Sequence, residues 1–272
     1  MVNEVLLVDF MYLWNKLYYV AKSNPEKDFL SSLHVTMKKI AMNALYTRKY
    51  VVLDGADGTK KHKKLLSTYK EGRADKTAVY KELNDFISCC SHTYPNIFFL
   101  RAQEREADEV IAAMVKSLVR KENKVYVYSG DKDLLQLMVY PSVYVSHKYC
   151  GNFAITPLSD KELQKKLDTI SGSTISKVGD ILKFRIFRGD ASDKIPAAIP
   201  RLPSKVICKV ISTWKGITPL TDEVIENMKP AVTESTWEKI EEHREDLKRN
   251  WKLMQLQHLD DESILAETKR LK

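Results

Sequence analysis

The chain has 272 residues, of which 44% are hydrophobic, and a formal charge of +8 from 44 Lys and Arg against 36 Asp and Glu. This length and apolar content suit one large domain, or a core with a smaller appendage, that needs no disulfide or structural metal. The four cysteines are too irregularly spaced for a disulfide framework or a zinc site, and no apolar run reaches the roughly 18 residues of a membrane helix. The N-terminus has no signal-peptide pattern, so we expect a cytoplasmic protein without membrane contact.

The first half of the chain alternates strand-like apolar runs with helical stretches. Predicted strands lie at 4–10, 50–55, 96–102 and 124–130, and predicted helices include 15–21 and 28–45. Such alternation is typical of an α/β fold with a central, mainly parallel sheet flanked by helices. Two shorter runs, 141–149 and 152–157, are predicted to form strands at the edge of this sheet.

The character of the chain changes twice. A very basic segment begins at Thr59, has a loop-like centre from Lys70 to Asp75 and continues as a helix. From Asp160 onward, helices and short turns dominate, and two or three polar helices are predicted after Thr221. We therefore expect an α/β core over 1–158, including the basic segment at about 60–82, and a helical region over 159–272.

Acidic residues follow the apolar runs. VLLVD ends in Asp9, YVVLD in Asp54, and VYVYSGDKD in Asp131 and Asp133; further acids are Glu106, Asp108, Glu109, Asp190 and Asp193. Any one of them could cap a helix or occupy a turn, and the last two could be an ordinary loop pair. Capping does not explain their recurrence after each strand. The carboxyl ends of parallel strands share one edge, so the pattern predicts a common site there.

Several carboxylates at one edge need compensation, and oxygen ligands favour hard divalent cations. We expect two or more Mg²⁺ ions, with Mn²⁺ as the alternative. If nine acids serve the metals, 36 − 9 = 27 remain against 44 basic residues, an excess of 17 positive charges. A basic exterior around an acidic centre is typical of phosphodiester hydrolysis, although charge alone suits a non-enzymatic basic protein equally well.

Other catalytic patterns are not found. The sequence has no GxSxG, GxxxxGK[ST], HExxH or GxGxxG motif. The histidines are scattered along the chain, and we expect five of them on the surface: His62, His92, His147, His243 and His258.

The segments EADEVIAA, SGDKDLLQL and GDASDKIP, in this order, resemble the 5′-nuclease superfamily. That superfamily includes bacteriophage 5′-3′ exonucleases, flap endonucleases, phage ribonuclease H-like enzymes and the 5′-nuclease domain of bacterial DNA polymerase I. The resemblance runs from Val5 to about Ile211 and implies a helical arch and a helix-three-turn-helix element at about 181–212. It also implies that the metal ligands are Asp9, Asp54, Glu106, Asp108, Glu109, Asp131, Asp133, Asp190 and Asp193, although relatives often carry Asp at the position of Glu109.

The segment STYKEGRADK resembles the family's arch. This implies that Lys70 and Arg73 steer phosphates at the catalytic centre and that Lys60, Lys61, Lys63 and Lys64 extend a basic funnel. Tyr69 either stacks on a base or anchors the arch.

The resemblance also implies that Arg201, Ser204, Lys205 and Lys209 contact phosphates of a duplex. Relatives have a glycine-rich turn here, whereas this chain has Ala197, Ala198, Pro200 and Pro203. Close backbone approach to phosphate and binding of K⁺ at this turn are therefore left open.

The expected function is that of a metal-dependent 5′-3′ exonuclease and flap endonuclease, acting during replication on DNA with free 5′ ends, flaps or nicks. RNA–DNA hybrids are a further expected substrate, and we expect a monomer that works with a replication-fork protein. One alternative is a non-catalytic protein that binds branched DNA. Another is a PIN-like ribonuclease, against which residues 67–76 and 190–209 argue because such enzymes lack the arch and the DNA-gripping element.

Overall fold

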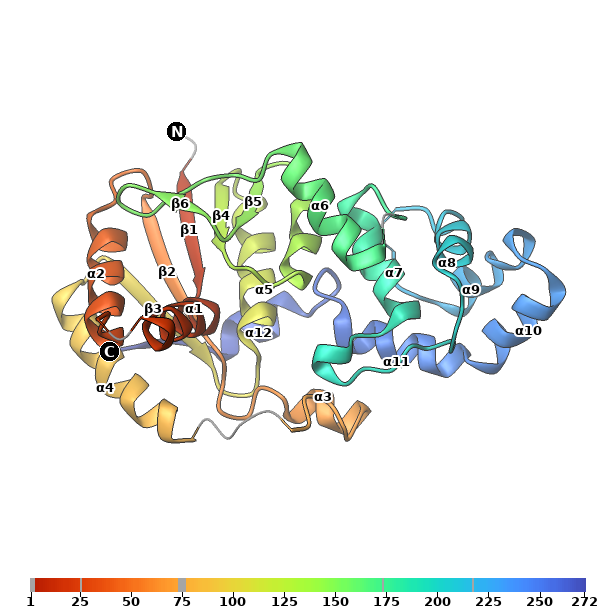
Figure 1. Cartoon of the computed structure of the whole chain (residues 1–272), viewed down its shortest axis with the longest axis horizontal. Helices are drawn as coiled ribbons and strands as arrows, with labels where there is room; N and C mark the ends of the chain where they lie inside the picture. Colours follow the sequence, from red (N-terminus) through yellow and green to blue (C-terminus); the bar gives the residue numbers. More distant parts are fainter. Residues whose placement is uncertain (1–2, 25, 73–76, 173, 217) are drawn as a thin grey trace. The chain divides into compact units, whose positions relative to one another are not determined.

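The computed structural model describes residues 3–24, 26–72, 77–172, 174–216 and 218–272, without side chains at 77–81. It divides the chain into two compact units (Figure 1). The first contains 1–58, 73–158 and 259–272, and the second contains 59–72 and 159–258. None of the described helices is long and apolar enough to cross a membrane.

A six-stranded sheet forms the centre of the first unit, with strand order β5-β4-β1-β2-β3-β8. Its strands are β1 (Glu4–Asp9), β2 (Arg48–Leu53), β3 (Ile97–Ala102), β4 (Lys124–Tyr128), β5 (Val143–Ser146) and β8 (Thr268–Leu271). The first five run parallel, and β8 pairs antiparallel with β3. The predicted α/β fold with a mainly parallel sheet is therefore confirmed. The run at 152–157 does not join this sheet, because β6 (Tyr149–Cys150) and β7 (Ala154–Ile155) form a separate two-stranded ribbon.

Helices connect the parallel strands, as the alternation predicts (Figure 1). They are α1 (Phe10–Ser23), α2 (Phe29–Met42), α4 (Thr77–Thr93), α5 (Ala107–Val119) and the 3₁₀ helix η1 (Asp133–Val139), while α12 (Asp261–Glu267) leads into the antiparallel β8. Aspartates begin the first two helices: Asp9 accepts the N–H of Tyr12, and Asp28 accepts the N–H of Ser31.

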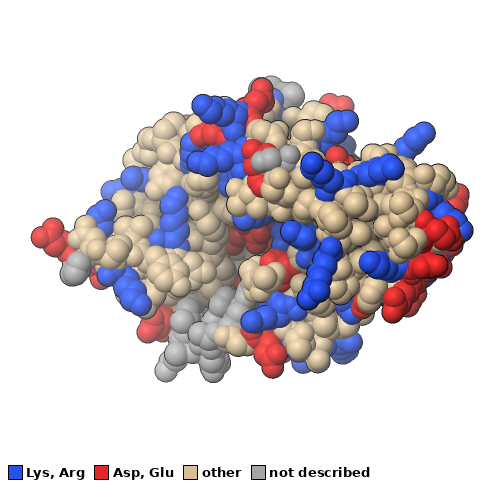
Figure 2. All heavy atoms as spheres, turned by 45° about the vertical axis from the view of Figure 1, so that its right-hand side comes forward, with Lys and Arg blue, Asp and Glu red and all other residues tan. Residues whose placement is uncertain are grey.

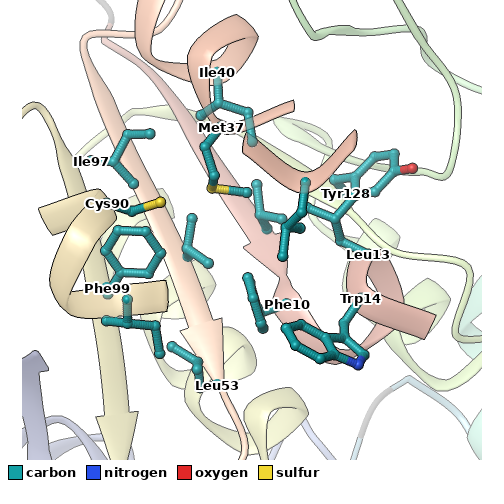
Figure 3. Close-up of a cluster of buried hydrophobic side chains, with 14 of the residues drawn as sticks. Phe10, Leu13, Trp14, Met37, Ile40, Leu53, Cys90, Ile97, Phe99 and Tyr128 are labelled. Carbon is teal, nitrogen blue, oxygen red and sulfur yellow. The ribbon is translucent and has the colours of Figure 1, made fainter. Parts of the chain in front are cut away.

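A hydrophobic core lies between the sheet and helices α1, α2 and α4 (Figure 3). Leu6 and Val8 of β1 contribute to it, while the alternate residues of this strand are also fully buried. Burial on both faces explains why the strand reads as a continuous apolar run. Phe10 packs against Trp14, with ring centroids 5.9 Å apart. The strand and the first turn of α1 are thus fixed on both sides of Asp9.

The segment 259–272 belongs to the first unit, which differs from its expected place in the helical region. Helix α12 packs against α5, where Asp261 forms ion pairs with buried Lys116 and with Arg120. Strand β8 then adds to the edge of the sheet, with Leu271 opposite Phe99. The sequence TKRL is short and polar, as edge strands often are, and for this reason it gave no strand signal.

The second unit is helical. It contains α3 (Lys60–Leu65), α6 (Asp160–Ser171), η2 (Val178–Asp180), α7 (Ile181–Arg188), η3 (Ala191–Asp193), α8 (Ser204–Ile211), α9 (Asp222–Glu226), η4 (Lys229–Ala231), α10 (Glu234–Glu242) and α11 (Arg244–Met254). Residues 181–187 of α7 are all buried. The buried Asn250 of α11 donates to the carbonyl oxygens of Ile186 and Pro196, over 3.0 and 2.9 Å, and so fixes the chain after α7.

Candidate functional site

Asp9 occupies the centre of the row of strand ends, because β1 lies between β2 and β4. Its Oδ1 accepts the N–H of Tyr12 over 3.0 Å, and its Oδ2 accepts the hydroxyl of Ser129 over 2.7 Å. The first bond caps α1 and the second reaches the end of β4. Asp9 therefore links two neighbouring strand ends.

The end of β4 carries the next two acids. The Ser129 hydroxyl oxygen accepts the N–H of Asp131 over 3.0 Å, and Oδ1 of Asp131 accepts the N–H of Asp133 over 2.8 Å. These bonds form a continuous chain from Asp9 to the start of η1. Gly130 lies between Ser129 and Asp131, and a Cβ there would lie 2.3 Å from the Tyr12 ring. Glycine at this position lets the Tyr12 ring lie against the turn, and a larger residue would displace that ring.

The ends of β2 and β3 form the other half of the site. Asp54 follows β2, and its Oδ1 accepts the N–H of Ala107 in the first turn of α5 over 2.9 Å. In the same turn, Asp108 accepts the N–H of Glu109 over 2.7 Å, while Glu106 is the N-cap residue and is buried. Gly55 permits a close approach of the two loops, since a Cβ there would lie 2.1 Å from the carbonyl oxygen of Ala102.

The two halves meet electrostatically at Asp9. Burial raises the pKa of Asp9 to about 7, an effect that the hydrogen bonds from Tyr12 and Ser129 partly offset. The negative charges of Asp54 and Asp131 contribute a smaller part of this rise. The carboxyl groups of Asp54, after β2, and Asp131, after β4, are therefore within electrostatic reach of Asp9 at the end of β1.

The side chains at this edge suit hard cations, because the acids and Ser129 offer only carboxyl and hydroxyl oxygens. Across the described parts of the chain, however, no three His, Cys, Asp or Glu side chains are arranged so that they could hold a metal ion. Asp9, Asp54, Asp108 and Asp131 instead accept backbone N–H groups at helix and turn starts. The capping roles considered for single acids are thus present, and metal binding remains a prediction.

Glu109 has a distinct environment. Its Oε2 accepts the N–H of Glu106 over 2.9 Å, and its Oε1 lies 3.4 Å from the guanidinium of Arg105. Both carboxyl oxygens therefore have positively polarised partners within the start of α5. The predicted metal role of Glu109 is not favoured by this arrangement.

Asp190 and Asp193 lie in the second unit, after α7. Asp190 forms an ion pair with Arg185. It also accepts two hydrogen bonds from Ser192, one from the N–H over 2.9 Å and one from the hydroxyl over 2.7 Å. Burial acts to raise the pKa of Asp190, but Arg185 and Ser192 outweigh it and hold this pKa below its ordinary value. Asp193 lies 3.8 Å from the ammonium of Lys70. Both acids thus have cationic partners in their own unit, and their metal role remains a prediction.

The predicted arch residues begin in the second unit. Helix α3 carries four of these lysines: Lys60, Lys63 and Lys64 are exposed, and Lys61 is half-buried. Arg73 lies outside the described residues. Lys70 has a left-handed backbone, with φ of 53°, and donates its N–H to the carbonyl oxygen of Asp193 over 2.9 Å.

Tyr69 and His62 differ from the sequence-based expectation in their exposure. The Tyr69 ring is 3% exposed and lies 4.9 Å from the ring of His62, which is also buried rather than on the surface. A buried ring is not available to a base, so the structure supports the anchoring role of Tyr69 and corrects its assignment to nucleic-acid binding. The apolar parts of the two rings explain the burial of His62.

Helices α7 and α8 fall within the range predicted for the helix-three-turn-helix element. On α8, Lys205 and Lys209 are exposed one turn apart, Ser204 is half-buried in the first turn, and Arg201 is exposed before it with φ of 59°. On the face drawn in Figure 2, Lys and Arg side chains are spread widely, and a group of Asp and Glu lies at the right-hand end. Contacts of these four residues with a duplex remain a prediction.

A family model described as the 5′-3′ exonuclease, N-terminal resolvase-like domain, matches residues 4–168. The chain belongs to the 5′-3′ exonuclease family. The match covers the strand-end acids of the first unit, from Asp9 to Asp133, and so confirms the resemblance to the 5′-nuclease superfamily.

Curated members of this exonuclease family are similar over most of the chain. A 5′-3′ exonuclease of Mycoplasmopsis pulmonis is 26% identical over 234 residues, covering 82% of this chain and 70% of the relative. The flap endonuclease Xni of Shewanella pealeana is 25% identical over 256 residues, covering 93% of this chain and 91% of the relative. The DNA polymerase I of Thermus aquaticus is 29% identical over 192 residues, which span 68% of this chain and 20% of the polymerase.

Solved structures of bacteriophage T5 proteins share the fold of this exonuclease-family chain. The T5 5′-exonuclease with bound zinc ions has a TM-score of 0.62 at 18% identity, covering 97% of this chain and 93% of that chain. A T5 flap endonuclease in complex with DNA and metal ions has a TM-score of 0.63 at 18% identity, covering 97% of this chain and 99% of that chain.

Two site residues were missed by the sequence reasoning. Ser129 joins Asp9 to Asp131, and Tyr12 packs over Gly130. A small hydroxyl residue at the very end of a strand, two positions before an acid, was the available signal for Ser129. For Tyr12 the sequence offered only its place one helical turn after Asp9.

Proposed function

We propose that this chain is a divalent-metal-dependent phosphodiester hydrolase that acts on DNA as a 5′-3′ exonuclease and flap endonuclease. The observation that carries the proposal is the group of carboxyls at one edge of the sheet, where Asp54 and Asp131 raise the pKa of Asp9. Membership of the exonuclease family supports the reaction class. The relatives named for flap cleavage, and the one bound to DNA and metal ions, support the substrate.

The proposed ligands of the first metal ion are Asp9, Glu106, Asp108 and Asp131, with Asp54 beside them. Asp133, Asp190 and Asp193 are proposed to support a second ion on the strength of the sequence motifs. Mg²⁺ is the expected ion and Mn²⁺ a substitute, because all of the donors are oxygens. When bound, such ions supply Lewis-acid stabilisation of the phosphate and lower the pKa of a coordinated water.

The chain's own residues set the conditions for binding. Asp9 must lose its proton, and its pKa of about 7 places this loss at neutral pH. Ser129 and the N–H of Tyr12 hold its two oxygens in place during this change. Asp54 and Asp108, fixed at the start of α5, orient the opposite half of the site. These bonds fix the carboxyl groups at the strand ends, and metal binding would require them to exchange backbone N–H groups for the cation and to move closer together.

Substrate selection is proposed to depend on shape and on phosphate charge. Lys70 and Arg73 would steer the phosphates of a single-stranded 5′ end, and the lysines of α3 would guide the strand toward them. Lys205, Lys209, Arg201 and Ser204 would hold the duplex through its phosphates, independent of base identity. Action on RNA–DNA hybrids and during replication, by a monomer together with a replication-fork protein, completes the proposal.

Cleavage of 5′-labelled flap, nicked and RNA-primed duplexes in Mg²⁺ tests this function. We expect the wild type to cleave at least the flap and the nicked duplex, and Asp131→Asn to lose more than about 100-fold in rate because a charged oxygen ligand is lost. EDTA should abolish cleavage by the wild type. Binding of the flap without metal-dependent cleavage would instead favour a non-catalytic protein that recognises branched DNA.

A further inference from the structure

Arg105 connects three segments of the first unit at the acidic edge. Its carbonyl oxygen accepts the N–H of Gly55, the residue after Asp54, over 2.9 Å. Its guanidinium forms two parallel bonds to Glu267, with Nε to Oε2 at 3.0 Å and Nη2 to Oε1 at 3.1 Å. The third guanidinium nitrogen lies 3.4 Å from Glu109. One arginine therefore touches the loop after β2, the start of α5 and the end of α12.

Glu109 links Arg105 to the backbone at the start of α5. Its other oxygen accepts the N–H of Glu106 over 2.9 Å, and this N–H belongs to the residue at which the helix begins. A continuous path therefore runs from Glu267 through Arg105 and Glu109 to Glu106. The side chains of Arg105 and Glu109 are 13% and 7% exposed, so solvent screens their interaction only weakly.

Glu267 is held in its own position by α12. Its Oε1 also accepts the hydroxyl of Ser263, one turn earlier in that helix, over 3.2 Å. The other end of α12 makes a separate contact: Asp261 forms an ion pair over 3.1 Å with Arg120, at the end of α5. The Arg105–Glu267 bonds therefore lie at the start of α5, and the Arg120–Asp261 ion pair lies at its end. Only the Arg105–Glu267 bonds lie beside the acids.

We propose that Glu109 and Glu267 are positioning residues that act through Arg105 to hold the start of α5, and with it Glu106 and Asp108, in the ligand-bearing arrangement. This inference rests on the proposed nuclease function. It removes Glu109 from the metal ligands and makes the segment 259–272, which lies outside the matched family region, a contributor to metal binding. The positive charge of Arg105 also offsets repulsion among the clustered carboxylates.

Metal dependence of cleavage distinguishes a positioning role from general stabilisation. For Glu267→Gln we expect the half-saturating Mg²⁺ concentration to rise about 10-fold, with kcat at saturating Mg²⁺ within about 3-fold of wild type, as for other groups that orient metal ligands. Arg120→Gln is the matched control, since it weakens the contact at the other end of α12. It should lower Tm without changing the half-saturating Mg²⁺ concentration. An unchanged Mg²⁺ requirement in folded Glu267→Gln would overturn the role of Glu267.

A second comparison tests Glu109. Gln at this position keeps an oxygen for the N–H of Glu106, so Glu109→Gln should retain kcat within about 3-fold at saturating Mg²⁺, whereas Asp108→Asn should lose more than about 100-fold. Equal losses in the two variants would show that Glu109 is a ligand after all. If Glu267→Gln fails to fold, Arg105→Lys replaces it, because lysine keeps the charge but not the paired bonds.

The inference and the function can fail separately. Absence of cleavage by the wild type would contradict the proposed function, while the Mn²⁺-dependent rise in Tm would still measure metal binding. In that case Glu267→Gln should require about 10-fold more Mn²⁺ than wild type for the same rise. An identical Mn²⁺ response of the two proteins would contradict the inference.

Discussion

Ser129 donates its hydroxyl hydrogen to Asp9 over 2.7 Å and so joins the ends of β4 and β1. The bond favours the ionised form of Asp9 and thereby opposes the burial that raises its pKa. One hydroxyl thus influences the pH at which the central carboxylate is ready for a cation.

Ser129→Ala is therefore expected to shift the pH dependence of cleavage. At limiting Mg²⁺ the rate of the wild type should rise with pH through about 7, because Asp9 must lose its proton before the cation binds. Without the hydroxyl the pKa of Asp9 increases, and the rising limb should move to higher pH. Ser146→Ala is a matched control, since Ser146 also ends a strand and accepts an N–H two residues later, but contacts none of the acids through its described bonds. Superimposable profiles for the wild type and Ser129→Ala would contradict this account.

Asp9→Asn should abolish cleavage but stabilise the metal-free protein at neutral pH. The ordinary pKa of Asp is 3.8, and folding raises it to about 7. Below pH 3.8 both states are protonated; between the two values only the unfolded state ionises, so the wild type loses stability as pH rises. Asparagine escapes this loss, and the gain should be about 2–4 kcal/mol above pH 7 and vanish near pH 4.

Thermal unfolding in EDTA at pH 4, 6 and 8 measures this gain. Asp28→Asn provides the control, because Asp28 also caps a helix but its pKa is lowered rather than raised. If the Tm of Asp9→Asn at pH 8 is below that of the wild type, ionised Asp9 does not destabilise the folded protein.

Gly55→Ala should disrupt the site through the backbone. A Cβ at this position would lie 2.1 and 2.3 Å from the carbonyl oxygens of Ala102 and Gln103, so the loops after β2 and β3 would have to separate. We expect a loss of about 2–3 kcal/mol in stability and a large loss of cleavage. Gly151→Ala is the control: no atom lies within 4 Å of its Cβ position, so only its φ of 48° is unfavourable. Equal effects of the two substitutions on cleavage would argue against the close approach at Gly55.

Lys70→Ala should reduce kcat by at least about 10-fold with little loss of stability, because the charge is proposed to act on the substrate. The φ of 53° at this position strains lysine and alanine alike, because both carry a Cβ. Lys70→Gly relieves that strain and lacks the charge, so it should be as inactive as the alanine variant. Recovery of activity in Lys70→Gly would assign the effect to the backbone. Single-turnover cleavage of a flap substrate gives the rates.

Lys205→Ala and Lys209→Ala should weaken duplex binding by about 3- to 10-fold each, without changing the rate at saturating substrate. Each removed phosphate contact lowers the slope of log K against log salt by about 1, equally for any base sequence. Titrations at several salt concentrations with Ca²⁺ in place of Mg²⁺ provide the slope. A salt dependence equal to that of the wild type would place the duplex elsewhere.

The sequence predicted the parallel sheet and the row of acids well, because both depend on local patterns. Buried strands read as apolar runs; Asp9 and Asp54 come directly at the ends of such runs, and Asp131 comes three residues after β4. The sequence could not show that each acid already accepts a backbone N–H, since that depends on the φ and ψ of the following residues. Nor could it place Glu267 beside Arg105, because no local pattern links residues so far apart.

Strand β8 has a consequence for how the molecule folds. It pairs Leu271 with Phe99, a separation of 271 − 99 = 172 positions, and the whole second unit except 59–72 lies between them. Contacts at such separations form late, since a long loop must close first. Until then β3 is an open sheet edge on which another chain can add a strand. Refolding should therefore slow and aggregation increase with protein concentration, and a peptide with the sequence of β8 should compete for the vacant edge.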